Sequence, residues 1–461
     1  MGLTFAKAAP SEPAQVDDSD AARAVAAIVA DKSFSRGKVG ISIVDLETGK
    51  VLAAHNEHEA MNPASNAKLY TAAAALSLLG PAHRYETSLV GSIRGETVNT
   101  GLTVRGYGDP SLKTADLAGL VQELVGLGIR NINGDIFVDQ AFFDDVYTPP
   151  AFEQQPNEWA YFRAPVSAIA LNRNTVTATM RPSGKSSSIV TFDPPGFVDA
   201  EGAINHDDGG TESVKMALSP QGQRLKAKLA GSFSTPLYRI TKRVEDPTLL
   251  AGYALKALLE GAGIKVSGEV KSGKGKGHVL VRHQSATLSE LLFPVGKNSD
   301  NFYAEMIFKT LGGEAKGRPA SSGNAADAVT KWLESEQLLD AGMLIKNGSG
   351  LFDANRVTAS GMTSLLKRMA GDPKVATEYI AQLAVSGVDG TLARRLRGAS
   401  TRGFIRAKTG TLNDTIALSG YVLRKTKRPI AFSILFNSVG GKQDSARAAA
   451  DHLVEKLARE Q

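Results

Sequence analysis

The residue pattern changes from helix-rich to strand-rich and back along the sequence, which divides the chain into two ends and a long middle. Residues 1–82 and 283–461 contain Ala- and Leu-rich segments with helical spacing, together with a few longer apolar runs. The stretch between them carries many short β-type runs separated by Gly, Asn and Asp, and residues 183–243 are still richer in turn residues. We therefore expect a discontinuous domain formed by both ends, an inserted β-rich domain of residues 83–182 and 244–282, and a nested domain of residues 183–243.

The two ends predict a mixed α/β (α+β) domain, in which helices flank an antiparallel sheet. Strand-like runs occupy residues 39–45, 50–54, 403–408, 417–424 and 429–437. Helical patterns occupy residues 66–79, 288–292, 301–311, 325–338, 361–369 and 442–459.

The composition excludes several kinds of site. The chain has 461 residues, no cysteine, and a net charge of +6 from 53 Lys and Arg against 47 Asp and Glu. Without cysteine there is no thiol nucleophile, thiolate metal site or disulfide. The mild positive charge is compatible with peripheral association with a membrane or cell wall, and it does not indicate a nucleic-acid binder. No apolar run approaches the roughly 18–20 residues of a membrane span.

The first residues suggest export. Phe5-Ala-Lys-Ala-Ala9 has the small-residue character of a signal-peptidase site, although no charged and apolar leader precedes it. A lack of cysteine also suits an oxidising compartment. We expect a periplasmic protein whose sequence begins near its mature N-terminus.

The first motif is Ser65-Asn-Ala-Lys68, at the start of a predicted helix. Residues three apart on a helix share one face, so the hydroxyl and the amine can meet. Serine becomes a good nucleophile only when a neighbour takes its proton, and lysine does so only with a lowered pKa. Alone, this pattern is more typical of a helix start with an exposed lysine.

The second motif, Ser299-Asp-Asn301, precedes another helical run. Such a tripeptide is common at helix N-caps. From a turn, the same hydroxyl and carboxamide can both point into a cleft, where one relays a proton and the other holds a substrate amide.

The third motif, Lys408-Thr-Gly410, ends a strand-like run and is followed by Thr411. The lysine supplies positive charge for a carboxylate. The glycine lets a ligand approach the backbone of the strand.

In this order, S-x-x-K, S-x-N and K-T-G form the signature of penicillin-binding proteins and serine β-lactamases. The 234 residues from Ser65 to Ser299 match the long insertion of one class. The chain resembles the low-molecular-mass class C penicillin-binding proteins, the D-Ala-D-Ala carboxypeptidase/endopeptidase family S13. Further segments that resemble this family are residues 62–69, 106–112, 134–136, 165–174, 387–392 and 407–412.

The resemblance implies a transpeptidase-like fold with inserted β-rich domains, and it implies catalytic roles. Ser65 would attack the carbonyl of the penultimate D-alanine of a peptidoglycan peptide. Lys68 would accept its proton, assisted by Ser299 and Asn301, and Lys408 would bind the terminal carboxylate.

The same resemblance implies the binding groups. The backbone N–H groups of Ser65 and Thr411 would form the oxyanion hole. Thr409, Gly410, Thr411 and Asn413 would contact substrate. β-Lactams would acylate Ser65, and no metal or cofactor is implied.

One segment departs from the family's pattern. Where relatives often have DGSGLSR, this chain has NGSGLFD at residues 347–353, so Asp353 replaces an arginine that helps bind a diaminopimelate-type side chain. A carboxylate there would repel another carboxylate. Residues 155–162 keep the expected tryptophan-and-acid pattern poorly, and Glu158 is a weak candidate partner for an amine. These departures put the preferred stem peptide in doubt.

Other functions stay open. A β-lactamase or esterase is an alternative on the same fold, although no E-x-x-L-N arrangement is present to activate a deacylating water. A non-catalytic cell-wall-binding regulator is another. A Ser-His-Asp hydrolase is disfavoured, because all the histidines lie in polar surroundings: His55, His58, His83, His206, His278, His283 and His452.

Overall fold

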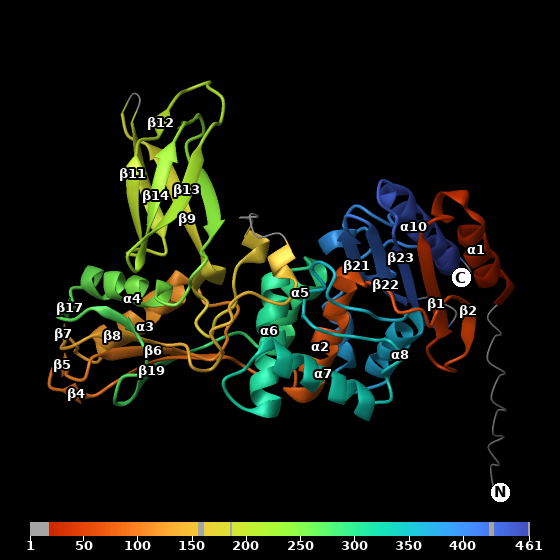
Figure 1. Ribbon diagram of the computed structural model, residues 1–461, viewed down its shortest axis with the longest axis horizontal. Helices are drawn as coiled ribbons and strands as arrows, with labels where there is room; N and C mark the ends of the chain where they lie inside the picture. The colour runs from red at the N-terminus through yellow and green to blue at the C-terminus, as the bar shows by residue number, and fades with distance from the viewer. Residues whose placement is uncertain (1–17, 155–160, 185–186, 424–427, 460–461) are drawn as a thin grey trace, which may run out of the picture.

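The computed structural model describes residues 18–154, 161–184, 187–423 and 428–459 (Figure 1). Within these residues, no helix has both the length and the apolar character needed to cross a membrane.

A six-stranded, wholly antiparallel sheet joins the two ends of the chain, in the order β2-β1-β23-β22-β21-β20. Its strands are β1 (Lys38–Asp45), β2 (Val51–His55), β20 (Ala384–Val385), β21 (Ile405–Leu412), β22 (Thr415–Val422) and β23 (Ile430–Asn437). The N-terminal β1 pairs with β23 along its whole length, from Lys38 opposite Asn437 to Asp45 opposite Ile430. Segments almost 400 residues apart in sequence therefore form the centre of one sheet.

Helices cover both faces of this sheet, and every residue of β22 is buried. On one face lie α1 (Asp18–Ala30) and α10 (Gln443–Arg459), which also contact each other. The other face packs on a helical layer made of α2 (Ala67–Leu78), α5 (Leu288–Lys297), α6 (Asn301–Lys316), α7 (Ser322–Ser335), α8 (Ala359–Ala370) and α9 (Ala376–Ala381). The two faces have separate apolar cores.

The outer parts of the middle stretch form two further sheets, with two helices packed against them. A five-stranded sheet has the order β18-β8-β6-β3-β19, and a four-stranded sheet has the order β17-β7-β5-β4. Their strands are β3 (Glu86–Gly91), β4 (Ile93–Arg94), β5 (Thr97–Val98), β6 (Leu102–Gly106), β7 (Asn131–Ile132), β8 (Ile136–Asp139), β17 (Lys265–Val266), β18 (Val270–Ser272) and β19 (His278–Gln284). Helices α3 (Thr114–Gly126) and α4 (Leu250–Gly261) pack against them.

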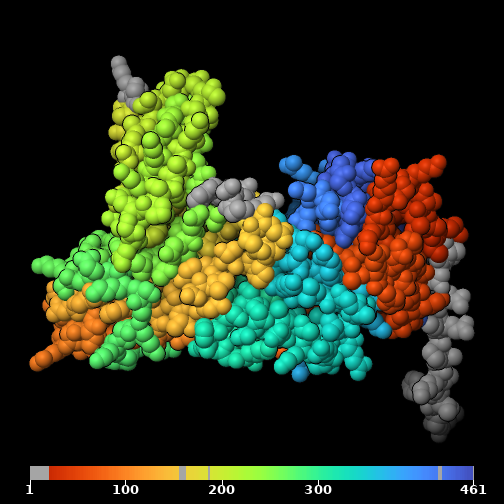
Figure 2. Space-filling view, in the orientation of Figure 1, coloured from red at the N-terminus to blue at the C-terminus, as the bar shows by residue number. Residues whose placement is uncertain are grey.

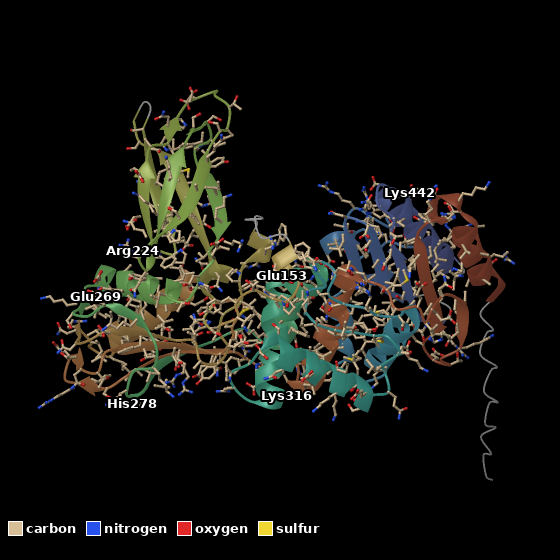
Figure 3. The ribbon with its side chains drawn as sticks, viewed as in Figure 1. Glu153, Arg224, Glu269, His278, Lys316 and Lys442 are labelled. Carbon is tan, nitrogen blue, oxygen red and sulfur yellow. The ribbon has the colours of Figure 1, made fainter. Side chains whose placement is uncertain are left out.

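Small sheets at the centre of the middle stretch stand away from the rest of the molecule (Figures 1 and 2). They have the orders β10-β9-β16, β11-β14-β13 and β12-β15. Their strands are β9 (Thr175–Pro182), β10 (Ser188–Asp193), β11 (Val198–Gly202), β12 (Asn205–His206), β13 (Lys215–Gln221), β14 (Arg224–Ala230), β15 (Ser232–Phe233) and β16 (Tyr238–Arg243). Arg224 lies at the base of this projection, and Lys442 lies at the other end of the molecule (Figure 3).

The expected antiparallel sheet with flanking helices is present, and the predicted helices and strands of both ends are found within a few residues. The sequence pattern missed α3 and α4 inside the β-rich middle. The signal for α3 was available, because Leu117, Leu120, Val121 and Leu124 have helical spacing and are buried. In addition, β9 precedes residue 183 yet pairs with β10 and β16, so the sheet of the nested segment starts before the expected boundary.

Phe436 provides a test of the core between the sheet and the outer helices. It is 0% exposed, and its ring lies 4.9 Å from that of Phe34. We expect Phe436→Ala to lower the free energy of unfolding by about 3–5 kcal/mol, because it leaves a cavity in this core. Urea denaturation measures the change. Leu127→Ala, which truncates a side chain that is 53% exposed, should have little effect, and equal losses for the two variants would contradict this packing.

Candidate active site

Ser65 lies on a tight turn that leads into α2. It is the middle residue of a 3-10 turn, Ala64–Asn66, and Ala64 has a φ of +45°. Asn62 Oδ1 accepts a hydrogen bond from Ala64 N at 2.9 Å, which satisfies one free N–H at this turn. A Cβ on Gly350 would lie 1.8 Å from Ala64 O, and one on Gly410 would lie 2.9 Å from Pro63 O. Two glycines therefore let the surrounding backbone hold the turn of Ser65 closely.

Lys68 meets Ser65 inside the protein. Its side chain is 1% exposed, and Nζ lies 3.0 Å from Ser65 Oγ. Nζ also donates to Asn301 Oδ1 at 2.7 Å and to the carbonyl oxygen of Ser349 at 2.6 Å. Both of these oxygens only accept hydrogen bonds, so a neutral amine uses its two N–H bonds on them. Its lone pair is then left for the Ser65 hydroxyl.

Burial favours this neutral form of Lys68. Desolvation lowers the pKa of Lys68 from 10.5 to about 7, while the carboxylates of Glu305 and Asp300 oppose the shift. The amine is therefore unprotonated in a large fraction of molecules at neutral pH, as a general base must be.

A second buried lysine lies on strand β21, which contacts the turn that carries Ser65. Lys408 is 0% exposed on β21, and its Nζ donates to Ser299 Oγ and to Thr409 O, both at 2.8 Å. Burial, with a smaller contribution from the charge of Lys68, lowers the pKa of Lys408 well below its usual value. Ser299 itself has a φ of +60°, which turns the chain just before α6.

The second motif divides its contacts between the two lysines. Asn301 contacts Lys68, whereas Ser299 contacts Lys408. Its middle residue, Asp300, is the N-cap of α6: its side chain accepts from Tyr303 N at 3.1 Å and pairs with Arg173 at 2.7 Å. The residue that caps the helix is thus flanked by the two residues that contact the lysines.

The strand that carries Lys408 is open along part of one side. β20 pairs only with Ala407 and Arg406, while β22 pairs with β21 along its full length. In the described chain, the stretch from Lys408 to Leu412 therefore has a strand neighbour on one side only. Thr409 Oγ1 donates to Thr391 Oγ1 at 2.9 Å, and Thr411 is exposed. Such an edge can pair with an extended peptide.

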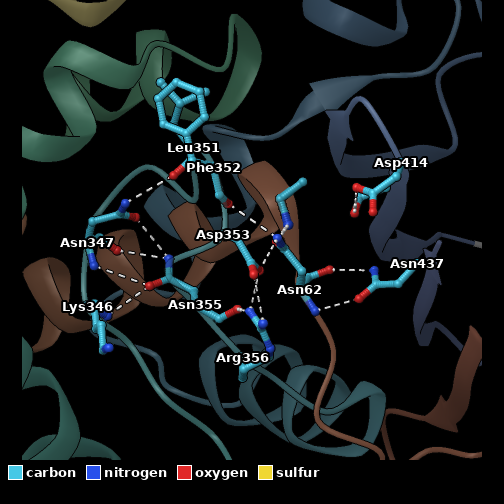
Figure 4. Close-up of polar contacts among 12 residues, drawn as sticks. Asn62, Lys346, Asn347, Leu351, Phe352, Asp353, Asn355, Arg356, Asp414 and Asn437 are labelled. Atoms are coloured by element: carbon cyan, nitrogen blue, oxygen red, sulfur yellow. Dashed lines mark hydrogen bonds and ion pairs between the residues drawn. The ribbon is translucent and has the colours of Figure 1, made fainter. Parts of the chain in front are cut away.

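A cavity of about 940 Å³ adjoins this strand, lined by Thr411, Asn413, Asp353 and Arg356 among others. Figure 4 shows that Asp353 is held from two sides: Arg356 donates to its two oxygens at 2.6 and 3.1 Å, and Asn62 Nδ2 donates at 3.0 Å. The hydrogen bonds from Arg356 lower the pKa of Asp353. The carboxylate that departs from the family pattern is therefore paired with a guanidinium three residues later.

The structure brings the predicted residues of the three motifs together, and it adds groups that the sequence pattern did not identify. Ser349 lies in the NGSGLFD segment, which departs from the family's pattern at Asp353. Glu305 follows Asn301 by one helical turn, a spacing that was readable from the sequence. Asn66, within the first motif, has its amide 2.7 Å from Ser419 Oγ, and with Nδ2 facing the strand it donates to Lys408 O at 2.9 Å. Glu158 lies outside the described residues.

This arrangement is suited to acyl transfer: a serine faces a buried neutral amine, beside the strand edge that carries Lys408, where an extended peptide can lie. In the part of the chain that the structure describes, there is no cluster of three or more His, Asp or Glu side chains able to hold a metal ion. The basic group 3.0 Å from Ser65 Oγ is the amine of Lys68. In a Ser-His-Asp hydrolase, a histidine would occupy this place.

The fold and site define an enzyme of the penicillin-binding class, and comparisons with known proteins identify its family. The model of the D-Ala-D-Ala carboxypeptidase 3 (S13) family matches residues 21–459. The chain belongs to this family, and it is a serine-type D-alanyl-D-alanine carboxypeptidase. A D-alanyl-D-alanine carboxypeptidase of Actinomadura sp. (strain R39) is 32% identical over 94% of this chain and 83% of its own length.

Other relatives agree with this assignment. The D-alanyl-D-alanine carboxypeptidase DacB of Haemophilus influenzae is 25% identical over 89% of this chain and 88% of its own length. A crystal structure of penicillin-binding protein 4 from Haemophilus influenzae has the same fold, with a TM-score of 0.78 and 24% identity, and covers 97% of this chain and 99% of that one.

The lowered pKa of Lys68 predicts the acid side of the pH–rate profile. Protonated Lys68 cannot accept the Ser65 proton, so kcat/KM should fall about tenfold per pH unit below about pH 7 and level off above it. Release of D-alanine from a synthetic peptide, measured between about pH 5 and pH 9, checks this. A rate that keeps rising towards the ordinary lysine pKa of 10.5 would contradict the assignment.

Proposed function

We propose that the chain hydrolyses the terminal D-alanyl-D-alanine bond of peptidoglycan stem peptides through an acyl-enzyme on Ser65. The observation that carries this proposal is the 3.0 Å approach of buried Lys68 to Ser65 Oγ. Lys68 takes the hydroxyl proton as Ser65 attacks the penultimate carbonyl. The bond to the terminal D-alanine then breaks as this proton passes to the leaving nitrogen, which restores neutral Lys68. Water then hydrolyses the ester and frees Ser65.

The edge of β21 supplies the binding groups in this scheme. Lys408 binds the terminal carboxylate, whose negative charge favours the protonated form of this lysine. Ser299 Oγ accepts a hydrogen bond from Lys408 Nζ at 2.8 Å. Thr409, Gly410 and Thr411 line the path of the peptide. The backbone N–H groups of Ser65 and Thr411 stabilise the negative oxygen of the tetrahedral intermediate.

The same nucleophile extends to two related reactions. A cross-linked peptide presents the same D-alanyl carbonyl with a larger leaving group, so DD-endopeptidase activity needs no further chemistry. A β-lactam carries a reactive amide beside a carboxylate, and Ser65 would open it. A structure of Haemophilus influenzae penicillin-binding protein 4 was solved in complex with a β-lactam. Rapid hydrolysis of the adduct would instead favour the β-lactamase alternative, and an inert Ser65 would favour a regulator.

The proposed peptidoglycan substrate and the lack of cysteine together support a periplasmic location at the cell wall. The domain proposal is a catalytic domain of residues 1–82 and 283–461, interrupted by the β-rich middle. The pairing of β9 with β10 and β16 supports starting the nested domain at residue 175.

The cavity beside Thr411 supports a preference among stem peptides. Asp353, Asp414 and Asp444 contribute acidic groups to it, and Lys38 and Arg356 contribute basic groups. Arg356 pairs with Asp353, Lys38 pairs with Glu59, and Asp444 pairs with Arg447. Among the described residues, Asp414 is therefore the acidic group of this cavity without an ion pair. We propose that the cavity accepts a stem-peptide side chain that ends in a free amine.

Substitution of the nucleophile tests the acyl-enzyme. Ser65→Ala should abolish both the covalent adduct with labelled penicillin and the release of D-alanine, because no other hydroxyl lies beside Lys68 Nζ among its hydrogen-bond partners in the described chain. Mass spectrometry detects the adduct and the peptide products. Ser335→Ala, on α7, serves as the control. An adduct or wild-type hydrolysis in Ser65→Ala would contradict the scheme.

Substitution of the acidic cavity residue tests the substrate preference. Asp353→Asn should raise KM for an amine-ended stem peptide by up to about fivefold, since a partly exposed ion pair contributes up to about 1 kcal/mol. The same peptide with its amine acetylated should show no such change. Steady-state kinetics on the two peptides measure the difference, and equal effects on both would refute the preference.

A further inference from the structure

Glu305 is a buried carboxylate that no step of the proposed mechanism uses. It is 2% exposed and lies on α6, one helical turn after Asn301. No lysine, arginine or histidine of the described chain pairs with it at ion-pair distance, whereas Asp300 on the same helix pairs with Arg173. An unpaired buried carboxylate is costly, so it must be held by hydrogen bonds.

Two consecutive backbone N–H groups hold it. Glu305 Oε1 accepts from Ser349 N at 2.8 Å, and Oε2 accepts from Gly348 N at 3.1 Å. These two hydrogen bonds fix the backbone of Gly348 and Ser349. The carbonyl oxygen of the same Ser349 accepts a hydrogen bond from Lys68 Nζ at 2.6 Å. The carboxylate is thus linked to the proposed base through one short piece of backbone.

The packing leaves this backbone little room to move. A Cβ on Gly348 would lie 2.5 Å from Phe308 Cβ and 2.6 Å from Ala304 O, so the segment presses directly on α6. Thr71 Oγ1 on α2 donates to Gly348 O at 2.8 Å from the other side. The position of α6 therefore determines where the Ser349 carbonyl lies, and this carbonyl accepts the hydrogen bond from Lys68.

The charged groups that face Lys68 come from two elements. Glu305 and Asp300 of α6 favour its protonated form, and the charge of that form in turn lowers the pKa of Lys408 of β21. Because Arg173 offsets Asp300, Glu305 is the carboxylate whose charge acts on Lys68 without a competing ion pair. Burial raises the pKa of Glu305, and its hydrogen bonds from Ser349 and Gly348 oppose this.

We propose that Glu305 is a positioning residue: it fixes the Gly348–Ser349 backbone so that the Ser349 carbonyl and Asn301 take the two N–H bonds of neutral Lys68, and its charge tunes the proton affinity of that amine. The inference rests on the proposed roles of Ser65 and Lys68, and it adds a second effect of Glu305, on pH dependence, that a purely structural residue would not have.

The test measures the rate of acylation by fluorescent penicillin against pH. In Glu305→Gln, the side-chain amide places an N–H against one of the two backbone N–H groups, so the acylation rate should fall about tenfold to a hundredfold. Loss of the negative charge should also move the acid limb of the profile to lower pH. Glu305→Asp keeps the charge but withdraws it from the backbone, so it should slow acylation while restoring the position of the limb.

Asp109→Asn is the matched control, because Asp109 is also a buried carboxylate, 1% exposed, whose contacts lie at Ser111 and His283. It should leave the acid limb in place. A slower Glu305→Gln with an unmoved limb, or wild-type acylation in that variant, would overturn the inference. If Glu305→Gln does not fold, wild-type acylation by Glu305→Asp would overturn it instead. Wild-type enzyme that forms no adduct on Ser65 would overturn the proposed function itself.

Discussion

The chemistry of the site depends on the burial of the Lys68 amine. An ammonium group removed from water is strongly disfavoured, and Lys68 has no carboxylate in direct contact to offset this cost. Its neighbours are a hydroxyl, an amide oxygen and a backbone carbonyl, which suit a neutral amine. The protein thus obtains a base near neutral pH from a side chain whose ordinary pKa is 10.5.

The fold explains how three distant segments meet around this amine. The antiparallel sheet joins strands from both ends of the chain, and α2 and α6 lie against one another on its face. Ser65 enters from the turn before α2, Asn301 from the start of α6, and Lys408 from β21. The long stretch between α2 and α5 does not disturb this contact, because the chain departs from the helical layer after α2 and returns to it at α5.

Much of this was predictable from the sequence, because the order of the motifs and the apolar periodicity are local signals. Lys408 could be identified because its K-T-G tripeptide follows S-x-x-K and S-x-N in the family's order. Other features could not, because they depend on tertiary contacts. The Ser349 carbonyl is a backbone group without a side-chain signal, and the pairing of Asp353 with Arg356 depends on the turn between them. The helices of the middle were missed because β-type runs on either side dominated the pattern.

Acylation in this scheme requires that Lys68 is a neutral base in the resting enzyme. An NMR titration of protein labelled with ¹³C at lysine Cε tests it most directly, with the resonances assigned through Lys68→Arg and Lys408→Arg variants. The Lys68 signal should titrate with a pKa of about 7. A Lys68 signal that titrates near the ordinary value of 10.5 would contradict it.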